Sequence, residues 1–194
     1  MRILSLGDNI WRDIESFPVD PIYLNSSPSE MGEYAAVYFR STLNWLAIQN
    51  EFYYTVSNIK DITVEQFVIV SLDLGSETYN QYLLPRGFDE VPPVMPTIGV
   101  LGDRFCFSYC YKEIDFVIWE MKKFGVKDSW TPFLKINYHN LQVNYDYSDD
   151  DCIKYNFKFV PLFLSKDGDT LIMCNNHEME AIIYNWRNNR VERT

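Results

Sequence analysis

Hydrophobic residues in this chain occur in short runs, most of which alternate with polar residues or end at a turn signal. Runs of this kind, flanked by Gly, Asp, Asn or Ser, predict β-strands joined as hairpins. Three hairpins follow from the pattern, over Ala35–Ile48, Thr97–Tyr109 and Phe159–Met173. No segment keeps a helical period over about ten residues. Phe116–Val126 (FVIWEMKKFGV) comes nearest, but its place in the repeat described next favours a strand.

A second pattern is an apolar strand end, then a Gly-polar turn, then an aromatic residue that opens the next strand. It covers Ser5–Trp11, Leu72–Tyr79, Lys123–Trp130 and, in a degenerate copy, Tyr184–Val191. Such recurrence, with several short strands in each repeat, is typical of propeller blades. In the second copy we expect Gly75 to take the positive φ that a tight turn requires.

The repeats predict an all-β chain folded as a partial β-propeller of about three and a half four-stranded antiparallel blades. The half-blade covers residues 1–14, and the other blades cover about 35–84, 97–136 and 159–194. Turns inside the hairpins are short, whereas four connections are long, namely 15–34, 49–65, 85–96 and 137–158. In an up-and-down blade the long connections share one face, so we expect binding on that face.

Composition excludes several classes of protein. Of 194 residues, 47% are hydrophobic and 16% aromatic, which suits a packed β-rich core and not a disordered chain. The net charge of −10 argues against a nucleic-acid partner or an anionic membrane surface. The longest apolar runs are about four residues, whereas a membrane span needs roughly 20. The first residues lack the apolar region of a signal peptide, so we expect a cytoplasmic or nuclear protein.

Residue types that support catalysis or metal binding are present, but not in a recognised arrangement. His139 and His177 lie in polar loops, and the cysteines at 106, 110, 152 and 174 show no CxxC spacing. The acidic segments Ser148–Asp151 and Asp167–Asp169 lack the spacing of a calcium loop. No nucleophile motif occurs, and nothing selects a carboxylate pair for glycoside hydrolysis. We therefore expect reduced cysteines, no metal, no cofactor and no enzymatic activity.

The aromatic residues fall into two groups. Those at repeated strand positions, such as Trp45, Trp119 and Trp130, are expected to pack within or between blades. Aromatic residues in the long connections and beside them have amphipathic side chains suited to a protein-binding hot spot. The candidate protein-binding residues, with one arginine, are Phe52, Tyr53, Tyr54, Arg86, Phe88, Tyr111, Tyr145 and Tyr147. For each of them the alternative is local packing that holds its loop in place.

Four segments, in order along the chain, resemble the F-box-associated domain, type 1, of plant F-box proteins. Ser5–Ile14 (SLGDNIWRDI) is similar to the opening strand pair of that family, and Val37–Ala47 (VYFRSTLNWLA) is similar to its G-x-L-x-W-L element. Ile69–Pro85 (IVSLDLGSETYNQYLLP) resembles FDL-x-x-E-x-F-x-x-I-x-L-P. Ile118–Trp130 (IWEMKKFGVKDSW) resembles VWVMKEYGVKESW, the most specific of the four. The usual glycine of the family near Ser41 is replaced.

The resemblance implies that residues 1–194 form a kelch-like propeller domain, incomplete at its N-terminus, that recruits a target protein. In that family an N-terminal F-box docks a Skp-type adaptor and, through it, a cullin–RING ubiquitin ligase. This chain begins with the second hairpin of a blade, so ligase docking is assigned to none of its residues. The adaptor and cullin are expected as partners only if an F-box lies upstream.

We therefore expect a protein-binding substrate-recognition module of an F-box-type (SCF) ubiquitin ligase, acting in protein ubiquitination. Its target protein is not identified by the sequence. Two alternatives stay open. One is a carbohydrate-binding or carbohydrate-active propeller, which would gather aromatic and carboxylate side chains in one pocket. The other is a non-functional truncated remnant.

Overall fold

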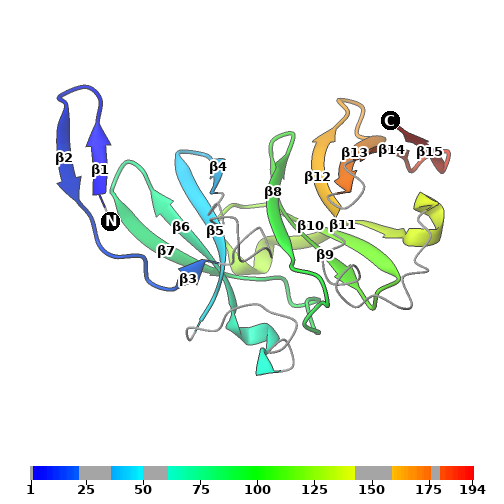
Figure 1. The fold of residues 1–194 in the computed structure, drawn as a ribbon, viewed down its shortest axis with the longest axis horizontal. Helices are drawn as coiled ribbons and strands as arrows, with labels where there is room; N and C mark the ends of the chain where they lie inside the picture. Colours follow the sequence, from blue (N-terminus) through cyan, green and yellow to red (C-terminus); the bar gives the residue numbers. More distant parts are fainter. Residues whose placement is uncertain (1, 22–35, 50–60, 143–158, 176–179) are drawn as a thin grey trace.

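The computed structural model describes residues 2–21, 36–49, 61–142, 159–175 and 180–194. In these ranges the chain forms fifteen β-strands and three single-turn 3₁₀ helices (Figure 1). None of these short helices has the length or the apolar surface to cross a bilayer. The all-β class predicted from the hydrophobic pattern is confirmed.

The first two strands form a hairpin at one end of the molecule. β1 (Arg2–Ser5) pairs antiparallel with β2 (Ile10–Asp13). Every side chain of the two strands is at least partly exposed, and Trp11 is 56% exposed. A two-stranded hairpin buries little apolar surface by itself. An ion pair of 2.7 Å between Arg12 and Glu77 connects it to the neighbouring sheet.

Five strands form the second sheet: β3 (Asp20–Pro21), β4 (Val37–Phe39), β5 (Thr42–Ile48), β6 (Phe67–Asp73) and β7 (Thr78–Leu83). Their order is β3-β5-β6-β7, and β4 shares the outer edge of β5 with β3. The helix η2 (Val64–Gln66) leads into β6. Both faces of β6 are buried, which explains its uninterrupted apolar run.

The third sheet contains β8 (Thr97–Leu101), β9 (Arg104–Tyr111), β10 (Asp115–Met121) and β11 (Trp130–Asn137), in the order β11-β10-β9-β8. The helix η3 (Lys127–Ser129) precedes β11 and η4 (Tyr138–Leu141) follows it. Of the ambiguous segment Phe116–Val126, the part up to Met121 is a strand, as its position in the repeat predicts, and residues 122–126 form a turn. Cys106 and Cys110 are buried free thiols in β9, and burial raises the pKa of Cys106 to about 12.

The fourth sheet contains β12 (Phe159–Leu164), β13 (Thr170–Asn175), β14 (Glu180–Asn185) and β15 (Arg190–Arg193), side by side in chain order. Its inner face buries Leu171, Met173 and Ile182 completely. The opposite face includes Phe163, which is 54% exposed, and the half-buried Ile183. This sheet therefore has one packed face and one partly apolar, open face.

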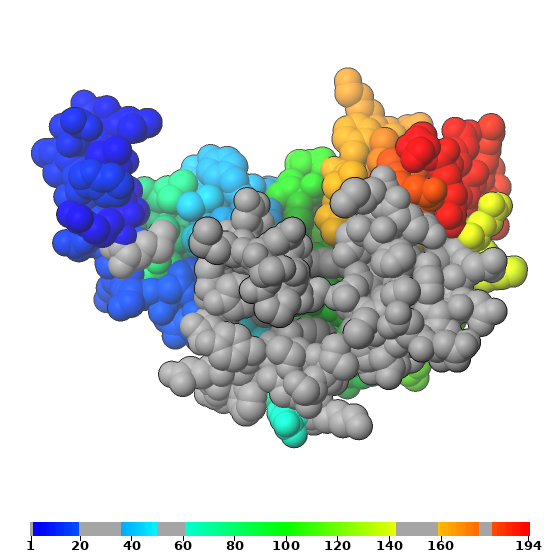
Figure 2. All heavy atoms as spheres, in the orientation of Figure 1, coloured from blue at the N-terminus to red at the C-terminus, as the bar shows by residue number. Residues whose placement is uncertain are grey.

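The four sheets follow one another in chain order as a curved row. Figures 1 and 2 show the hairpin at one end of this row and the fourth sheet at the other. β8 of the third sheet lies between the second and fourth sheets, because it contacts β4 and β5 of the second sheet and β12 of the fourth. Neighbouring propeller blades have this arrangement. The described residues do not close a ring, so the sheet arrangement is propeller-like and the partial kelch-like propeller stays a prediction.

Apolar side chains fill the spaces between successive sheets, which we call seams. In the seam between the second and third sheets, Ile48 and Phe67 pack with Phe105 and Phe107. The residues at the alternate positions of β9 face the opposite side of the third sheet. Cys106 and Cys110 of β9, for example, pack into the seam between the third and fourth sheets. The two-residue period of a strand thus supplies both seams from one sheet.

The repeated strand–turn–aromatic pattern corresponds to a repeated turn geometry. In all four hairpins the fourth residue after the strand is left-handed, with φ between 53° and 80°, at Asn9, Glu77, Gly125 and Asn189. Gly75 is not left-handed, so the expectation for Gly75 is wrong. The backbone N–H groups of Gly75 and Ser76 instead donate to Asp73 Oδ1, each at 2.8 Å. An Asx turn therefore forms the start of this hairpin turn, and the positive φ falls at Glu77, as at the equivalent position of the other three hairpins.

Candidate functional site

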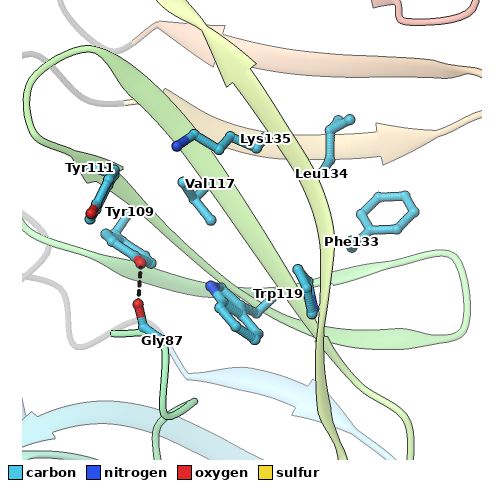
Figure 3. A pocket seen from close by; sticks show the side chains of 9 residues that line it. Gly87, Tyr109, Tyr111, Val117, Trp119, Phe133, Leu134 and Lys135 are labelled. Atoms are coloured by element: carbon cyan, nitrogen blue, oxygen red, sulfur yellow. Dashed lines mark hydrogen bonds between the residues drawn. The ribbon is translucent and has the colours of Figure 1, made fainter. Parts of the chain in front are cut away.

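A pocket of about 310 Å³ opens at the edge of the seam between the second and third sheets. Most of its lining comes from β9, β10 and β11, and the remainder from the connection that follows β7. The lining residues are Gly87, Tyr109, Tyr111, Val117, Trp119, Pro132, Phe133, Leu134 and Lys135. Figure 3 shows Tyr109, Tyr111, Val117, Trp119 and Lys135 on one side of β11, with the side chains of Phe133 and Leu134 on its other side. We call this pocket the seam pocket.

Strand alternation brings the polar and aromatic groups of the seam pocket to one face. Val117 of β10 lies opposite Tyr109 of β9 on one side and opposite Lys135 of β11 on the other. Cross-strand partners share a face, and residues two positions apart along a strand do so as well. Tyr111 and Trp119 therefore belong to the same face as Val117. The face is fixed by the register of the third sheet and not by a loop.

A β-bulge adds Phe133 to the lining. The register of β11 against β10 shifts between Ile118 and Trp119, where Leu134 and Pro132 are the partners. Phe133 is therefore the extra residue of the bulge, and a bulge changes the direction of its side chain. The ring of Phe133 packs edge-on against Trp186, with the centroids 5.9 Å apart. The bulge thus joins the seam pocket to the fourth sheet.

Gly87 forms the wall across from the third sheet, at a position where the close approach of Trp119 leaves no space for a side chain. A Cβ atom at Gly87 would lie 2.4 Å from Cζ2 of Trp119, which is closer than real contacts allow. The Gly87 carbonyl accepts a hydrogen bond of 3.0 Å from the Tyr109 hydroxyl, shown as a dashed line in Figure 3. The connection after β7 is therefore fixed against the third sheet.

Phe88 supports this wall from inside the core. It is 5% exposed, and its ring packs edge-on against Phe67, Phe107 and Tyr109 at centroid distances of 5.0 to 5.3 Å. Phe88 is therefore not available as a surface contact, and the expectation that it binds a partner directly is corrected. Local packing, the alternative left open for each loop aromatic, describes it. The ring of Phe88 fills space in the seam and so anchors the connection that follows β7.

The polar groups of the seam pocket are mainly hydrogen-bond donors. Lys135 Nζ lies 4.8 Å from the ring centroid of Tyr111 and forms an ion pair of 2.9 Å with Asp115. The pKa of Lys112 is raised, chiefly by its hydrogen bond with the Tyr111 side chain. Burial raises the pKa of Tyr109 to about 12, so this hydroxyl stays protonated. None of the lining residues is acidic.

Other predicted site residues lie in different places. Arg86 is exposed next to the pocket wall and pairs with Asp128 at 2.6 Å. Tyr111 is half-buried and lines the seam pocket. The structure therefore brings Arg86, Tyr111 and the anchor Phe88 to one region. The remaining candidates, Phe52, Tyr53, Tyr54, Tyr145 and Tyr147, lie outside the described residues.

The residues considered for metal binding do not converge where they are described. His139 is exposed in η4, and His177 and Cys152 lie outside the described residues. Cys174 is a half-buried free thiol in β13. In the described part of the chain, no three His, Cys, Asp or Glu side chains gather as a metal site requires.

Sequence reasoning missed most of the pocket lining. It assigned Trp119 to packing and did not single out Gly87, Val117 or Lys135. The alternation of Phe116–Met121 places Val117 and Trp119 on one face, which was a usable signal. The pairing of Lys135 with Val117 depends on register and on the bulge, and neither has a sequence signature here.

Comparison of the chain with protein-family models, with curated proteins and with solved structures found no match. The resemblance to the F-box-associated domain therefore rests on the four segments quoted above.

Proposed function

We propose that this chain is a protein-recognition module that binds its partner through the seam pocket. The observation that carries the proposal is a pocket with aromatic walls, hydrogen-bond donors and no acidic lining, held on the rigid third sheet. Aromatic side chains in a fixed pocket are suited to anchoring one or two side chains of a partner. The pocket volume is at the low end of the range for small-molecule sites, which fits such an anchor.

We further propose that the module is a kelch-like F-box-associated domain serving as the target receptor of an SCF-type ubiquitin ligase. One of the four family-like segments contributes to the pocket walls, and a second one ends beside them. Ile118–Trp130 contains Trp119, and Ile69–Pro85 ends where the Gly87 turn begins, since Phe88 N donates to Pro85 O. Docking of a Skp-type adaptor is assigned to no residue of this chain.

The composition of the pocket favours protein over carbohydrate. Sugar hydroxyls are both donors and acceptors, and we expect a glycan site to combine aromatic rings with carboxylates. The carboxylates beside the pocket belong to Asp115, which Lys135 and Asn137 engage, and to Asp89 and Glu90, which act on Tyr109, but none of them lines it. The seam pocket offers rings and donors instead. A protein partner with apolar side chains and exposed carbonyl groups matches this lining better.

Capture from plant cell extract tests the proposed function. The immobilised chain is compared with Tyr111→Ala, which removes a pocket ring, and with Tyr38→Ala, which removes a 63% exposed ring on β4. We expect the original chain and Tyr38→Ala to retain the same partner and Tyr111→Ala to lose it. Circular dichroism establishes that both variants are folded. Equal capture by all three proteins, or no specific capture by any, would contradict the proposal.

A further inference from the structure

The rings of the seam pocket form an angled platform for an apolar group, with two tyrosine rings that lie nearly at right angles. Trp119 is held against Gly87, and Tyr109 is held by its hydrogen bond to the same residue. Tyr111 lies beside Tyr109 at a centroid distance of 6.4 Å, with the two ring planes 84° apart. The platform is preformed, so a ligand need not order it, and binding loses less conformational entropy.

The hydrogen-bonding groups around these rings select a ligand with acceptors. The Lys135 ammonium carries three hydrogens, and the ion pair with Asp115 occupies only part of this capacity. The Tyr111 hydroxyl interacts with Lys112 and keeps its own hydrogen to donate. The indole N–H of Trp119 is buried beside the Tyr109 hydroxyl, with which it interacts, so the donors left for a ligand are those of Lys135 and Tyr111.

The charges around the seam pocket are compensated, because Lys135 pairs with Asp115 and Lys112 lies near Glu90 and Asp89. A cationic group would meet Lys135 in the lining and Lys112, whose Nζ lies 5.0 Å from the Tyr111 ring centroid. An acidic segment would meet a chain of net charge −10. The complementary ligand is therefore uncharged, apolar and rich in carbonyl acceptors.

We propose that the seam pocket binds a proline-rich segment in the polyproline II conformation. Within a polypeptide, proline has a carbonyl acceptor and no N–H donor, so it matches a pocket that supplies donors. Its ring packs on aromatic faces, and the polyproline II helix is already extended before binding. The proposal deepens the proposed function and rests on it, because it names the chemistry of the partner segment.

Titration of the ¹⁵N-labelled chain with decaproline tests this directly, with the tryptophan indole signals as the readout. The chain has 5 tryptophans, and Trp119→Phe assigns the signal of Trp119 by its disappearance. The other indole signals report whether that variant is folded. A glycine–serine peptide of the same length and cellohexaose serve as the comparison ligands.

We expect decaproline to shift the Trp119 signal in a saturable way and to leave the other indole signals in place. Tyr111→Ala should weaken the binding about tenfold, the loss expected for one aromatic contact, and Tyr38→Ala should leave it unchanged. A Trp119 signal that is unmoved by decaproline, or that moves equally with the glycine–serine peptide, overturns the proposal. A response to cellohexaose alone assigns the pocket to a glycan.

This experiment separates the two proposals. Capture of a partner that depends on Tyr111, without a decaproline response, leaves protein recognition standing and rejects the proline-rich ligand. Absence of both results rejects both proposals.

Discussion

Some positions in the hairpin turns have a left-handed backbone conformation but hold residues other than glycine. Arg40 and Ser41, between β4 and β5, have φ values of 47° and 62°. The family that the sequence resembles has a glycine near this position. A residue with a Cβ atom is strained at such a φ because Cβ approaches the following carbonyl oxygen. The backbone there is therefore one of the least favourable parts of the second sheet.

Ser41→Gly is expected to raise the free energy of unfolding by about 1 kcal/mol, because glycine removes that steric contact. The greater freedom of glycine in the unfolded chain offsets part of the gain. Urea denaturation measures the change. Ser76→Gly is the matched control, since Ser76 is not left-handed and the same substitution should bring no gain. Equal effects at the two positions would contradict the backbone explanation.

The carboxylate of Asp73 should make the stability of the folded chain depend on pH. Hydrogen bonds from the backbone N–H groups of Ser76 and Gly75 lower the pKa of Asp73 in the folded chain. The carboxylate therefore stabilises the fold above its unfolded pKa of about 3.9, and this contribution is lost as pH falls through the folded pKa. Asp73→Asn should reduce the loss of thermal stability between about pH 4 and pH 2. Asp103→Asn, at an exposed carboxylate in another turn, should not.

At the scale of elements, β10 shows how one strand serves two seams. Val117 and Met121 face the second sheet, and Phe116 and Ile118 face the fourth. By strand alternation, Glu120 lies on the same face as Phe116 and Ile118. It is buried, with its side chain 6% exposed. Its carboxylate is compensated by Arg104, 3.1 Å away, and by Lys122. A buried carboxylate is tolerated in this strand because both oxygens have a cationic partner.

A double-mutant cycle tests that explanation. Arg104→Leu should lower the free energy of unfolding by about 1–3 kcal/mol, since Glu120 then keeps only one partner and stays buried. Adding Glu120→Leu should restore part of the loss, because the uncompensated charge is removed. Glu120→Leu alone is less costly than Arg104→Leu in this account. Strict additivity of the two changes in denaturation experiments would show that the pair is not coupled.

Strands and hairpins could be predicted from the sequence more completely than the contacts between sheets. The hairpins Thr97–Leu101 with Arg104–Tyr111, and Phe159–Leu164 with Thr170–Asn175, follow from apolar runs and turn residues. Strand character is local, so a sequence pattern can identify it. The burial of Phe88 depends on space between two sheets, which no local pattern describes. The left-handed Glu77 was missed although its cause is local, since the fourth residue after the strand is left-handed in all four hairpins whatever its type.

At the scale of the whole molecule, the row of sheets leaves apolar surface at both ends. Ile10 and Trp11 of the N-terminal hairpin are 54% and 56% exposed, and Phe163 of the fourth sheet is 54% exposed. Apolar surface of this kind favours association. We expect sedimentation of the isolated chain to show self-association that increases with protein concentration.

Salt should strengthen this association, because it screens the repulsion between chains of net charge −10. Trp11→Glu and Phe163→Glu should reduce it, whereas Tyr38→Glu, away from the ends of the row, should have little effect. A monomer at all protein and salt concentrations would show that these ends are covered in solution.

The central claim is that the partner is recognised at the seam pocket and not at the short turns on the opposite face. Site-specific photocrosslinking tests it most directly, with benzoylphenylalanine placed at Arg86, beside the pocket wall, or at Lys166, in the exposed turn between β12 and β13. The account predicts a partner adduct from position 86 that disappears in the Tyr111→Ala background, and none from position 166. An adduct from position 166, or one from position 86 that is unaffected by Tyr111→Ala, would contradict it.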